Sequence, residues 1–514
     1  MTKLVGIDLG TTFSAIAMLN SIGRPEIIPN CEGERITASA VYFDEEEGGV
    51  RVGIEAINSR QLNTNRAVRF VKRYMGTDWT KTIDNHNWTP QEISSLILKK
   101  LKQDAEKEHG AISDVVISVP AHFDETRRKA TMDAGTLAGL NVIGIVNEPV
   151  AAALFYAASH DITGRVLVYD LGGGTFDVTI LDIKGKDMKI LCSQGDHALG
   201  GIDFDHKIIE LFEQEYQKQC NAKLIQNDQD MAKFEDEAED VKKTLSRRNN
   251  AKKILYGSNG SARAEITRDQ FEKAIESLIA RTEMLIDVAL DEAKSTTKDI
   301  NKILLVGGST RMPMVQERLT KKFGFAPEAA VNVDECVALG AAVHAGLTML
   351  REKPESVPQG IAGGLRDVRL KDVCNHSYGT ICAPVDEQTG RHVVRNTILL
   401  KKNTSLPCST TQTFYTMADN QTELQIMITQ GEDEDPDFVN KIATEIFELP
   451  AGRSAGRPIR VEYSYDANQR MHCEFEDQES GRKLEVEFCI GKDGELSQNH
   501  VHQQAETLQK MKVQ

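Results

Sequence analysis

The architecture of this chain follows from ten residues, VYDLGGGTFD, at Val168 to Asp177. They combine a short β-like run, an aspartate, three consecutive glycines, a threonine and a second aspartate. Adjacent glycines leave the backbone free to adopt positive φ, so that several N–H groups can converge on one anion. An ordinary glycine-rich hairpin would explain this stretch on its own. A related copy near the N-terminus, IDLGTT at Ile7 to Thr12, favours a pair of phosphate-binding hairpins.

The composition bounds the class of protein. At 514 residues the chain is too long for one hydrophobic core, so we expect two to four domains. Apolar residues at 40% and charged residues at 27% are typical of soluble globular proteins. The net charge of −16 would repel a phosphate backbone, which argues against nucleic acid as a partner.

Cysteine usage and the N-terminus indicate the compartment. The nine cysteines are scattered and form no C-x-x-C pair, as expected for thiols of a reducing compartment. The N-terminus lacks the basic and apolar regions of a signal peptide, and no window holds 18 uninterrupted apolar residues. We expect a monomeric, cytoplasmic protein without membrane contact.

Asp8 and Asp170 lie at the mouths of the two glycine turns. A carboxylate beside a phosphate is repelled by it unless a divalent cation lies between them, and Mg²⁺ suits such oxygen ligands. Asp8 alone could instead form an Asx-turn. Its repetition at Asp170 favours a magnesium site.

Helical and strand patterns alternate through the first 350 residues. TPQEISSLILKK, from Thr89, has the capping residues and apolar stripe of an amphipathic helix, whereas VVISVP, from Val115, reads as a buried strand. This alternation predicts an α/β architecture. The P-loop and dinucleotide fingerprints are missing. Two related hairpins about 160 residues apart instead imply two similar lobes that clamp ATP in the cleft between them.

A different pattern covers Cys374 to about Ile490. Short runs such as ELQIMITQGE and RPIRVEYSYD alternate apolar and polar residues and are separated by turns. This pattern predicts an antiparallel β-sandwich.

Taken together, the motifs resemble those of a known family. GIDLGTT, VPAHF, NEPVAAAL, DLGGGTFD, LGGIDFD, KKTLS, LVGGSTRMP and ALGAAV occur in the order and approximate spacing of the DnaK family of heat shock protein 70 chaperones. RNT, ADNQ, QGE and YDAN extend the likeness more weakly to about residue 490. The resemblance implies an actin-like, two-lobed ATPase domain at 1–350, a linker at 351–373, a β-sandwich peptide-binding domain at 374–490 and a short tail at 491–514 that could form a single helix.

The resemblance also assigns functions to the cleft. Mg-ATP or ADP would bind there, with K⁺ as a further cation, and hydrolysis would be slow. Asp8 and Asp170 would face the magnesium ion. Lys72 would hold the γ-phosphate and the attacking water, helped by Glu148, Asp177, Thr175 and Asp8. The other nucleotide contacts would come from Gly10, Thr11, Thr12, Phe13, Gly172, Gly173, Gly174, Gly200, Gly201, Glu239, Lys242, Lys243, Ser246, Gly307, Gly308, Ser309, Arg311 and Asp334.

Further assignments concern the peptide site and its coupling to ATP. By resemblance, Tyr378, Met417, Leu424 and Ile426 would line an apolar groove for an extended client peptide, although the same residues could equally be sandwich core. Pro120 and Arg128 match the relay between nucleotide and peptide sites, and Asp372 matches the linker aspartate that docks on the ATPase domain. The partners implied are client peptides, a J-domain cochaperone and a nucleotide exchange factor.

The sequence departs from the family pattern at several places, among them His197, which stands at a usual threonine position. Two cations interrupt the usual leucine run of the linker, VRLKDV at Val368 to Val373, so we expect weaker docking. Lys243 and Gly144 stand where the family has arginines, which predicts weaker adenine stacking and an unusual or missing J-domain partner. Only 24 residues follow Ile490, too few for the usual helical lid of about 100 residues, the size of a small domain. We therefore expect fast peptide release and the closest resemblance to the bacterial HscC-type subfamily.

Three rival functions share parts of these patterns. A sugar kinase or an actin-like filament protein would share the two-lobed core but leave the β-sandwich unexplained. A chaperone-like exchange factor or specialised regulator would bind ATP with little cycling. Measuring ATP turnover with and without unfolded peptide separates these alternatives from an ATP-dependent chaperone.

Overall fold

The computed structural model describes residues 3–45, 49–160, 162–329, 332–385, 390–467, 469–488, 508 and 511–514. The single helix predicted within 491–514 falls mainly outside these ranges. No helix among the described residues is both long enough and apolar enough to cross a membrane.

The N-terminal domain contains two sheets with the same strand order. The first runs β11-β10-β1-β2-β3 and the second runs β18-β17-β12-β13-β14, with β19 added at its edge. In each sheet an antiparallel hairpin, β1-β2 or β12-β13, is flanked by a parallel strand. The bounds are β1 Val5–Asp8, β2 Phe13–Leu19, β3 Pro25–Ile28, β10 Asp114–Val119, β11 Asn141–Asn147, β12 Thr163–Leu171, β13 Phe176–Lys184, β14 Asp187–Asp196, β17 Lys302–Val306 and β18 Glu328–Ala329. The sequence prediction of two similar lobes is consistent with this duplication.

Two alanine-rich helices, α4 (Glu148–Ser159) and α9 (Cys336–Glu352), pack between the sheets. Small side chains allow this close approach. A Cβ atom on Gly340 would lie 1.7 Å from the Ala151 carbonyl oxygen, and one on Gly6 would lie 2.0 Å from the Ala342 nitrogen. The NEPVAAAL and ALGAAV motifs thus have a packing function, because larger residues would push the lobes apart.

Smaller elements extend each lobe. The first lobe adds a three-stranded sheet of order β6-β5-β7, a β8-β9 hairpin and helices that cover the main sheet. Their bounds are β4 Thr37–Ala38, β5 Ala40–Phe43, β6 Val50–Val52, α1 Ile54–Arg60, β7 Ala67–Arg69, β8 Lys81–Ile83, β9 His86–Trp88, α2 Pro90–His109 and α3 Glu125–Leu137. The second lobe adds α5 Gly201–Cys220, α6 Asp228–Leu245, β15 Asn250–Gly257, β16 Gly260–Thr267, α7 Arg268–Glu292 and α8 Pro313–Phe323.

The segment predicted as a linker, 351–373, contains ordered elements that pack on the ATPase domain. Helix α10 (Gln359–Leu365) packs onto the core between the sheets, and β19 (Arg369–Lys371) pairs with β14 in parallel. Val368 and Val373 are buried, whereas the cations Arg369 and Lys371 are exposed. The cations therefore do not displace apolar groups from the interface as the sequence argument assumed, and docking strength stays an open prediction.

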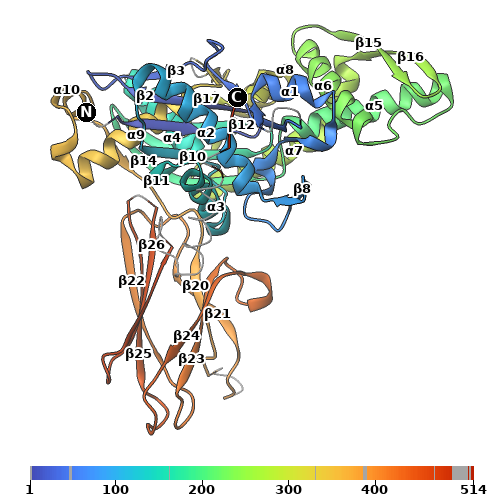
Figure 1. Cartoon of the computed structure of the whole chain (residues 1–514). Helices are drawn as coiled ribbons and strands as arrows, with labels where there is room; N and C mark the ends of the chain where they lie inside the picture. The colour runs from blue at the N-terminus through green and yellow to red at the C-terminus, as the bar shows by residue number, and fades with distance from the viewer. Residues whose placement is uncertain are drawn as a thin grey trace.

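The C-terminal domain is an antiparallel β-sandwich that projects from the N-terminal domain (Figure 1). Its sheets have the orders β21-β20-β23-β24 and β22-β25-β26-β27. The bounds are β20 Tyr378–Cys382, β21 Arg395–Leu400, β22 Cys408–Tyr415, β23 Glu423–Gln430, β24 Asn440–Glu448, β25 Pro458–Tyr465, β26 Met471–Asp477 and β27 Lys483–Phe488. Alternate residues of β25 and β26, such as Val461, Tyr463 and Phe475, fill the core. This confirms the sandwich predicted from period-two alternation.

Candidate nucleotide-binding site

The two glycine turns face each other across the lobes. A Cβ atom on Gly173 would lie 2.5 Å from the Thr12 side chain, and one on Gly174 would lie 2.6 Å from the Thr11 side chain. Real Cβ atoms do not approach other atoms so closely, so only glycine permits this contact. The two turns that were predicted to bind phosphate, one after Asp8 and one after Asp170, therefore contact each other directly.

A third glycine pair completes this region. The Gly201 N–H donates to the Gly172 carbonyl at 3.0 Å, and the Ile202 N–H donates to the Gly173 carbonyl at 2.9 Å. Helix α5 begins at Gly201, so the positive end of its dipole points at the glycine turn. This arrangement favours an anion at the junction of the three loops.

Four carboxylates and one buried lysine lie at or just behind the floor of the site, and Glu148, Asp170 and Asp177 are buried whereas Asp8 is half-buried. The Lys72 ammonium donates to the Glu148 carboxylate. Burial and the Glu148 charge raise the pKa of Asp8 to about 7 and that of Asp177 to about 8, and burial also raises the pKa of Asp170. Burial alone would lower the pKa of Lys72, but Glu148 and Asp8 outweigh it and raise the pKa. Four acidic groups therefore share the site with one ammonium, and burial disfavours the charged form of three of them while no further cation is bound.

These acidic groups fit a divalent cation, which would favour their charged form. Carboxylate oxygens are the ligands that Mg²⁺ prefers, and Mg²⁺ usually keeps several of its waters. Among the described residues, no three carboxylates of the site bring oxygens within 4.8 Å of one another. Binding of the ion by Asp8 and Asp170 through its water shell stays a prediction.

A cavity of about 730 Å³ extends from these carboxylates to the surface of the second lobe. At its outer end Lys242 donates to Asp205 at 2.7 Å and Lys243 pairs with Glu239 at 2.8 Å. This volume suits a ligand of nucleotide size. The predicted residues that line it are Asp8, Gly10, Thr11, Thr12, Phe13, Lys72, Glu148, Asp170, Gly172, Gly173, Thr175, Gly201, Glu239, Lys242, Lys243, Ser246, Gly307, Gly308, Ser309, Arg311 and Asp334.

Three predicted residues lie just behind the wall. Gly174 and Gly200 pack against the opposing loops, and Asp177 accepts the His122 N–H at 3.2 Å. Other lining residues were missed, namely Ile36, Phe70, Ile202, Asp205, Arg247, Val306, Met312, Gln316, Val333 and Val337. Asp205 had a signal, because it lies in the same LGGIDFD motif as Gly201. Phe70 has a φ of 60°, and no feature of the sequence alone indicates that it lines the cavity.

Comparison with known proteins identifies the family. The model of the family described as Hsp70 protein matches residues 4–514. The chain belongs to the Hsp70 family. As a member it is an ATP-dependent chaperone and an ATPase that binds ATP or ADP with Mg²⁺. Hsp70 chaperones in general bind client peptides, J-domain cochaperones and nucleotide exchange factors.

Ion pairs join the two lobes of this Hsp70 chain. Arg69 and Arg60, of the first lobe, both pair with Asp236 on α6. Arg73 pairs with Asp203 on α5 and donates to the Gly174 carbonyl at 3.2 Å. Because Arg73 follows Lys72 directly, a contact between the lobes lies next to that lysine in the chain.

A buried arginine connects the ATPase domain to the β-sandwich. Arg128 is 1% exposed and donates to Asn147 at 2.7 Å and to Gln469 at 2.5 Å. Gln469 in turn donates to the Asp372 carboxylate at 2.5 Å. Pro120, predicted to act with Arg128, is buried and accepts the Phe123 N–H at 3.1 Å. The predicted coupling residues thus lie around the interdomain junction.

A second contact at this junction involves a residue predicted to bind peptide. The hydroxyls of Tyr378 and Tyr465 donate to the Glu125 carboxylate at 2.6 and 2.9 Å. His376 lies beside them with its ring nitrogen 3.2 Å from the Phe123 carbonyl. In this arrangement the Tyr378 hydroxyl is therefore bound by the ATPase domain.

The structure does not gather the four predicted peptide-binding residues around one point. Tyr378 pairs with Gln430 at one end of β23, whereas Leu424 lies six residues earlier, about 20 Å along the strand. Ile426 is buried in the sandwich core, and Met417 is exposed in a loop. Peptide binding by these residues stays a prediction. Tyr378 lies at the interdomain junction, where it contacts Glu125.

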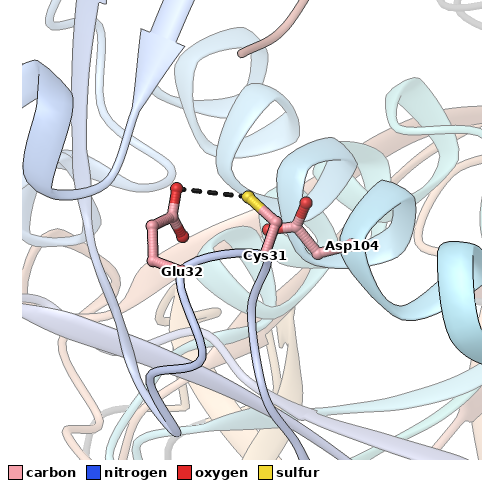
Figure 2. A group of neighbouring side chains, drawn as sticks. All are labelled: Cys31, Glu32 and Asp104. Carbon is pink, nitrogen blue, oxygen red and sulfur yellow. Dashed lines mark hydrogen bonds between the residues drawn. The ribbon is translucent and has the colours of Figure 1, made fainter.

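A separate group of possible metal ligands lies outside the cavity. Figure 2 shows Cys31, Glu32 and Asp104 close together, with a hydrogen bond between Cys31 and Glu32. The Lys100 ammonium lies 2.9 Å from the Cys31 sulfur and 2.7 Å from the Asp104 carboxylate. Because a cation already satisfies these groups, they do not indicate a metal centre.

Proposed function

We propose that ATP in the cavity controls the affinity of the β-sandwich for extended apolar peptides of client proteins. The observation that supports this is the position of Arg128. Its guanidinium donates to Asn147, which directly precedes Glu148, and also to Gln469 of the sandwich. Glu148 binds Lys72, so an unbroken chain of contacts joins the cavity floor to the sandwich. A movement of Lys72 or Glu148 would therefore alter the contact with Gln469.

The residues of the cavity act by positioning and charge. Asp8 and Asp170 would hold Mg²⁺, which would neutralise phosphate charge when bound. Lys72 points into the cavity and is fixed by Glu148, which suits it to hold a terminal phosphate and an attacking water. The N–H groups at the start of α5 and of the glycine turn stabilise the negative charge. This mechanism needs no covalent intermediate and is consistent with a slow ATPase.

The structure has the linker and the sandwich docked on the ATPase domain. In the structure β19 is docked on β14, and the Glu125, Arg128 and Asp372 contacts are all made. We assign this docked arrangement to the ATP-bound form with low peptide affinity. Release of the junction after hydrolysis would free Tyr378 and the sandwich to retain peptide.

Partner choice is a further part of the proposal. At Gly144, where the family has an arginine, a Cβ atom would lie 3.8 Å from Val116, so space for a side chain exists. Arg470 of the sandwich donates instead to the adjacent Ile143 carbonyl at 2.8 Å. We infer a specialised cochaperone preference and a place in a divergent subfamily of the HscC type. Stimulation of the ATPase by a general J-domain protein to the normal extent would contradict this inference.

The experiment that tests the function is steady-state ATP hydrolysis with and without an unfolded client peptide. Peptide should accelerate turnover in the unmodified chain. A Gln469→Asn variant should keep basal turnover and lose the acceleration. Turnover that ignores peptide in the unmodified chain would contradict ATP-controlled peptide binding and favour a regulator with little cycling.

A further inference from the structure

Residues Leu508 and Met511 to Gln514, called here the 508–514 segment, lie against the ATPase domain. Val50 donates to the Lys512 carbonyl at 2.9 Å, Gln514 donates to the Val50 carbonyl at 2.8 Å, and Val52 donates to the Gln514 carbonyl at 2.9 Å. The pairing is parallel, with Val513 opposite Val50. In Figure 1 the C mark accordingly lies among the blue elements of the ATPase domain, away from the sandwich.

This contact completes a free sheet edge. β6 is the edge strand of the sheet β6-β5-β7, and an edge strand offers unpaired N–H and C=O groups to another segment. Three backbone hydrogen bonds now use those groups. The addition of an extended segment to a sheet edge is a general mode of peptide recognition.

Side chains anchor the segment at a second place. Leu508 is only 4% exposed and belongs to the same core cluster as Val50 and Val52. Met511 and Val513 pack partly against this cluster. The sequence MKVQ places Met511 and Val513 two residues apart, so both face the core while Lys512 is exposed.

Lys99 of α2 binds the segment at both Leu508 and Met511. It is 7% exposed, and its ammonium donates to the Leu508 carbonyl at 2.9 Å and to the Met511 carbonyl at 2.7 Å. A buried ammonium is costly unless its hydrogen bonds are satisfied. Lys99 therefore contributes a specific polar contact beside the apolar anchor.

We propose that the β6 edge, Lys99 and the apolar site filled by Leu508 form a binding site for an extended apolar segment, which the chain's own 508–514 segment occupies. This site is separate from the ATP cavity and from the β-sandwich. Because the sandwich precedes the segment in the chain, occupation ties the sandwich to the ATPase domain at a second point besides the linker. Such a tether raises the effective concentration of the sandwich at its junction.

The length of the chain favours an occupant from the same molecule. Twenty peptide units separate Phe488, at the end of β27, from Leu508, and these can span up to about 66 Å. An intramolecular segment also competes at a far higher effective concentration than a second molecule. Occupation by a second copy is the alternative that the test must distinguish.

Hydrogen exchange of the full chain tests the site directly. The amides of Val50 and Val52 should exchange about 10- to 100-fold faster in Leu508→Asp, because the variant removes a buried anchor. Lys99→Met should also make the amides of Val50 and Val52 exchange faster. Lys107→Met, on the same helix but with an exposed ammonium, should leave these amides protected. Unchanged exchange at Val50 and Val52 in Leu508→Asp would overturn the proposal. The amides of β5 and β7 are the control, because they stay protected only while the sheet remains folded.

A synthetic peptide identifies the ligand class and the occupant. The peptide ETLQKMKVQ, residues 506–514, should restore protection of Val50 and Val52 in Leu508→Asp, and the same peptide with aspartate for leucine should not. In the unmodified chain, protection should not depend on protein concentration. Failure of the peptide to protect β6 would overturn the binding site. Protection that appears only together with a dimer in light scattering would overturn occupation within one molecule.

Discussion

The Arg128 guanidinium of the ATPase domain donates a hydrogen bond to the Gln469 side chain of the β-sandwich at 2.5 Å. Both residues are almost completely buried, and Gln469 also contacts Asp372 of the linker. Because Arg128 also binds Asn147, beside Glu148, one side chain contacts the sandwich and the edge of the ATP cavity at once.

Shortening Gln469 should uncouple the domains. Gln469 has a φ of 59°, a conformation that asparagine tolerates better than most residues, so Gln469→Asn preserves the turn while withdrawing the amide. Loss of hydrogen bonds to Arg128 and Asp372 should cost about 1–3 kcal/mol of docking. Peptide stimulation of the ATPase should fall while basal turnover remains. Gln425→Asn, on an exposed position of β23, is the matched control.

The hydroxyls of Tyr378 and Tyr465, which donate to Glu125, should stabilise docking of the sandwich on the ATPase domain without affecting the stability of the sandwich itself. Tyr465→Phe and Tyr378→Phe each remove one charge-assisted hydrogen bond, and each should increase protease cleavage of the linker about 5- to 30-fold. Tyr463→Phe is the control, because its hydroxyl donates to Gly379 within the sandwich. Cleavage that rises as much in Tyr463→Phe would mean that the sandwich, not the junction, had been weakened.

Removal of the Lys72 ammonium should separate binding from hydrolysis. Lys72→Met should lower the rate of ATP hydrolysis by about 10²–10³-fold, because a positioned charge at the reacting phosphate is lost. ATP should still bind, since the glycine turns and the adenosine end of the cavity are unchanged. Single-turnover kinetics measure the first effect and calorimetry the second. Lys252→Met, on β15, provides a surface control, and a normal rate in Lys72→Met would contradict the assignment.

Methyl groups on the central glycines should open the phosphate site. In Gly173→Ala and Gly174→Ala the new Cβ atoms would lie 2.5 and 2.6 Å from the Thr12 and Thr11 side chains. Overpacking of this kind costs about 1–3 kcal/mol and should weaken ATP binding about 10- to 100-fold. Gly144→Ala meets only Val116 at 3.8 Å and should bind ATP normally. Equal affinity in all three variants, measured by calorimetry, would show that the turns do not contact the nucleotide.

Acid should weaken the junction through two half-buried histidines. Burial lowers the pKa of His376 to about 3, with His122, Arg128 and Lys402 adding repulsion, and burial lowers the pKa of His122 to about 4. The separated domains would bind protons at the ordinary pKa near 6.5, so docking loses stability as the pH falls below 6.5, by up to about 1.4 kcal/mol per histidine per pH unit. Linker cleavage should rise between pH 7.5 and 5.5. His376→Gln should reduce this dependence, whereas His86→Gln, at an exposed position, should not.

Much of the nucleotide site could be predicted because its chemistry is local. Glycine turns, flanking aspartates and buried strands are patterns within about ten residues, and the structure brings the Asp8 and Asp170 turns together as the duplicated hairpin implied. Small-residue motifs on α4 and α9 were also visible, although their packing function became clear only from the contact between Gly340 and Ala151.

Contacts between distant segments could not be predicted. Glu125 and Gln469 carry no local signal of their interdomain function, because their partners come from the other domain. Tyr378 was assigned to peptide binding from its motif, but its hydroxyl is bound to Glu125. The tail at 491–514 was predicted as a possible single helix, and most of it lies outside the described residues. The pairing of Val513 with β6 had no sequence signal, since a free sheet edge is a property of the folded domain.

The central claim is that ATP sets the rate at which the sandwich releases peptide, and peptide dissociation tests it most directly. A fluorescein-labelled apolar peptide, selected on an array with the full chain, should leave at least about 10-fold faster in Mg-ATP than in ADP, a difference of about 1.4 kcal/mol. In Gln469→Asn the two rates should converge. Equal dissociation rates in ATP and ADP for the unmodified chain would contradict the account.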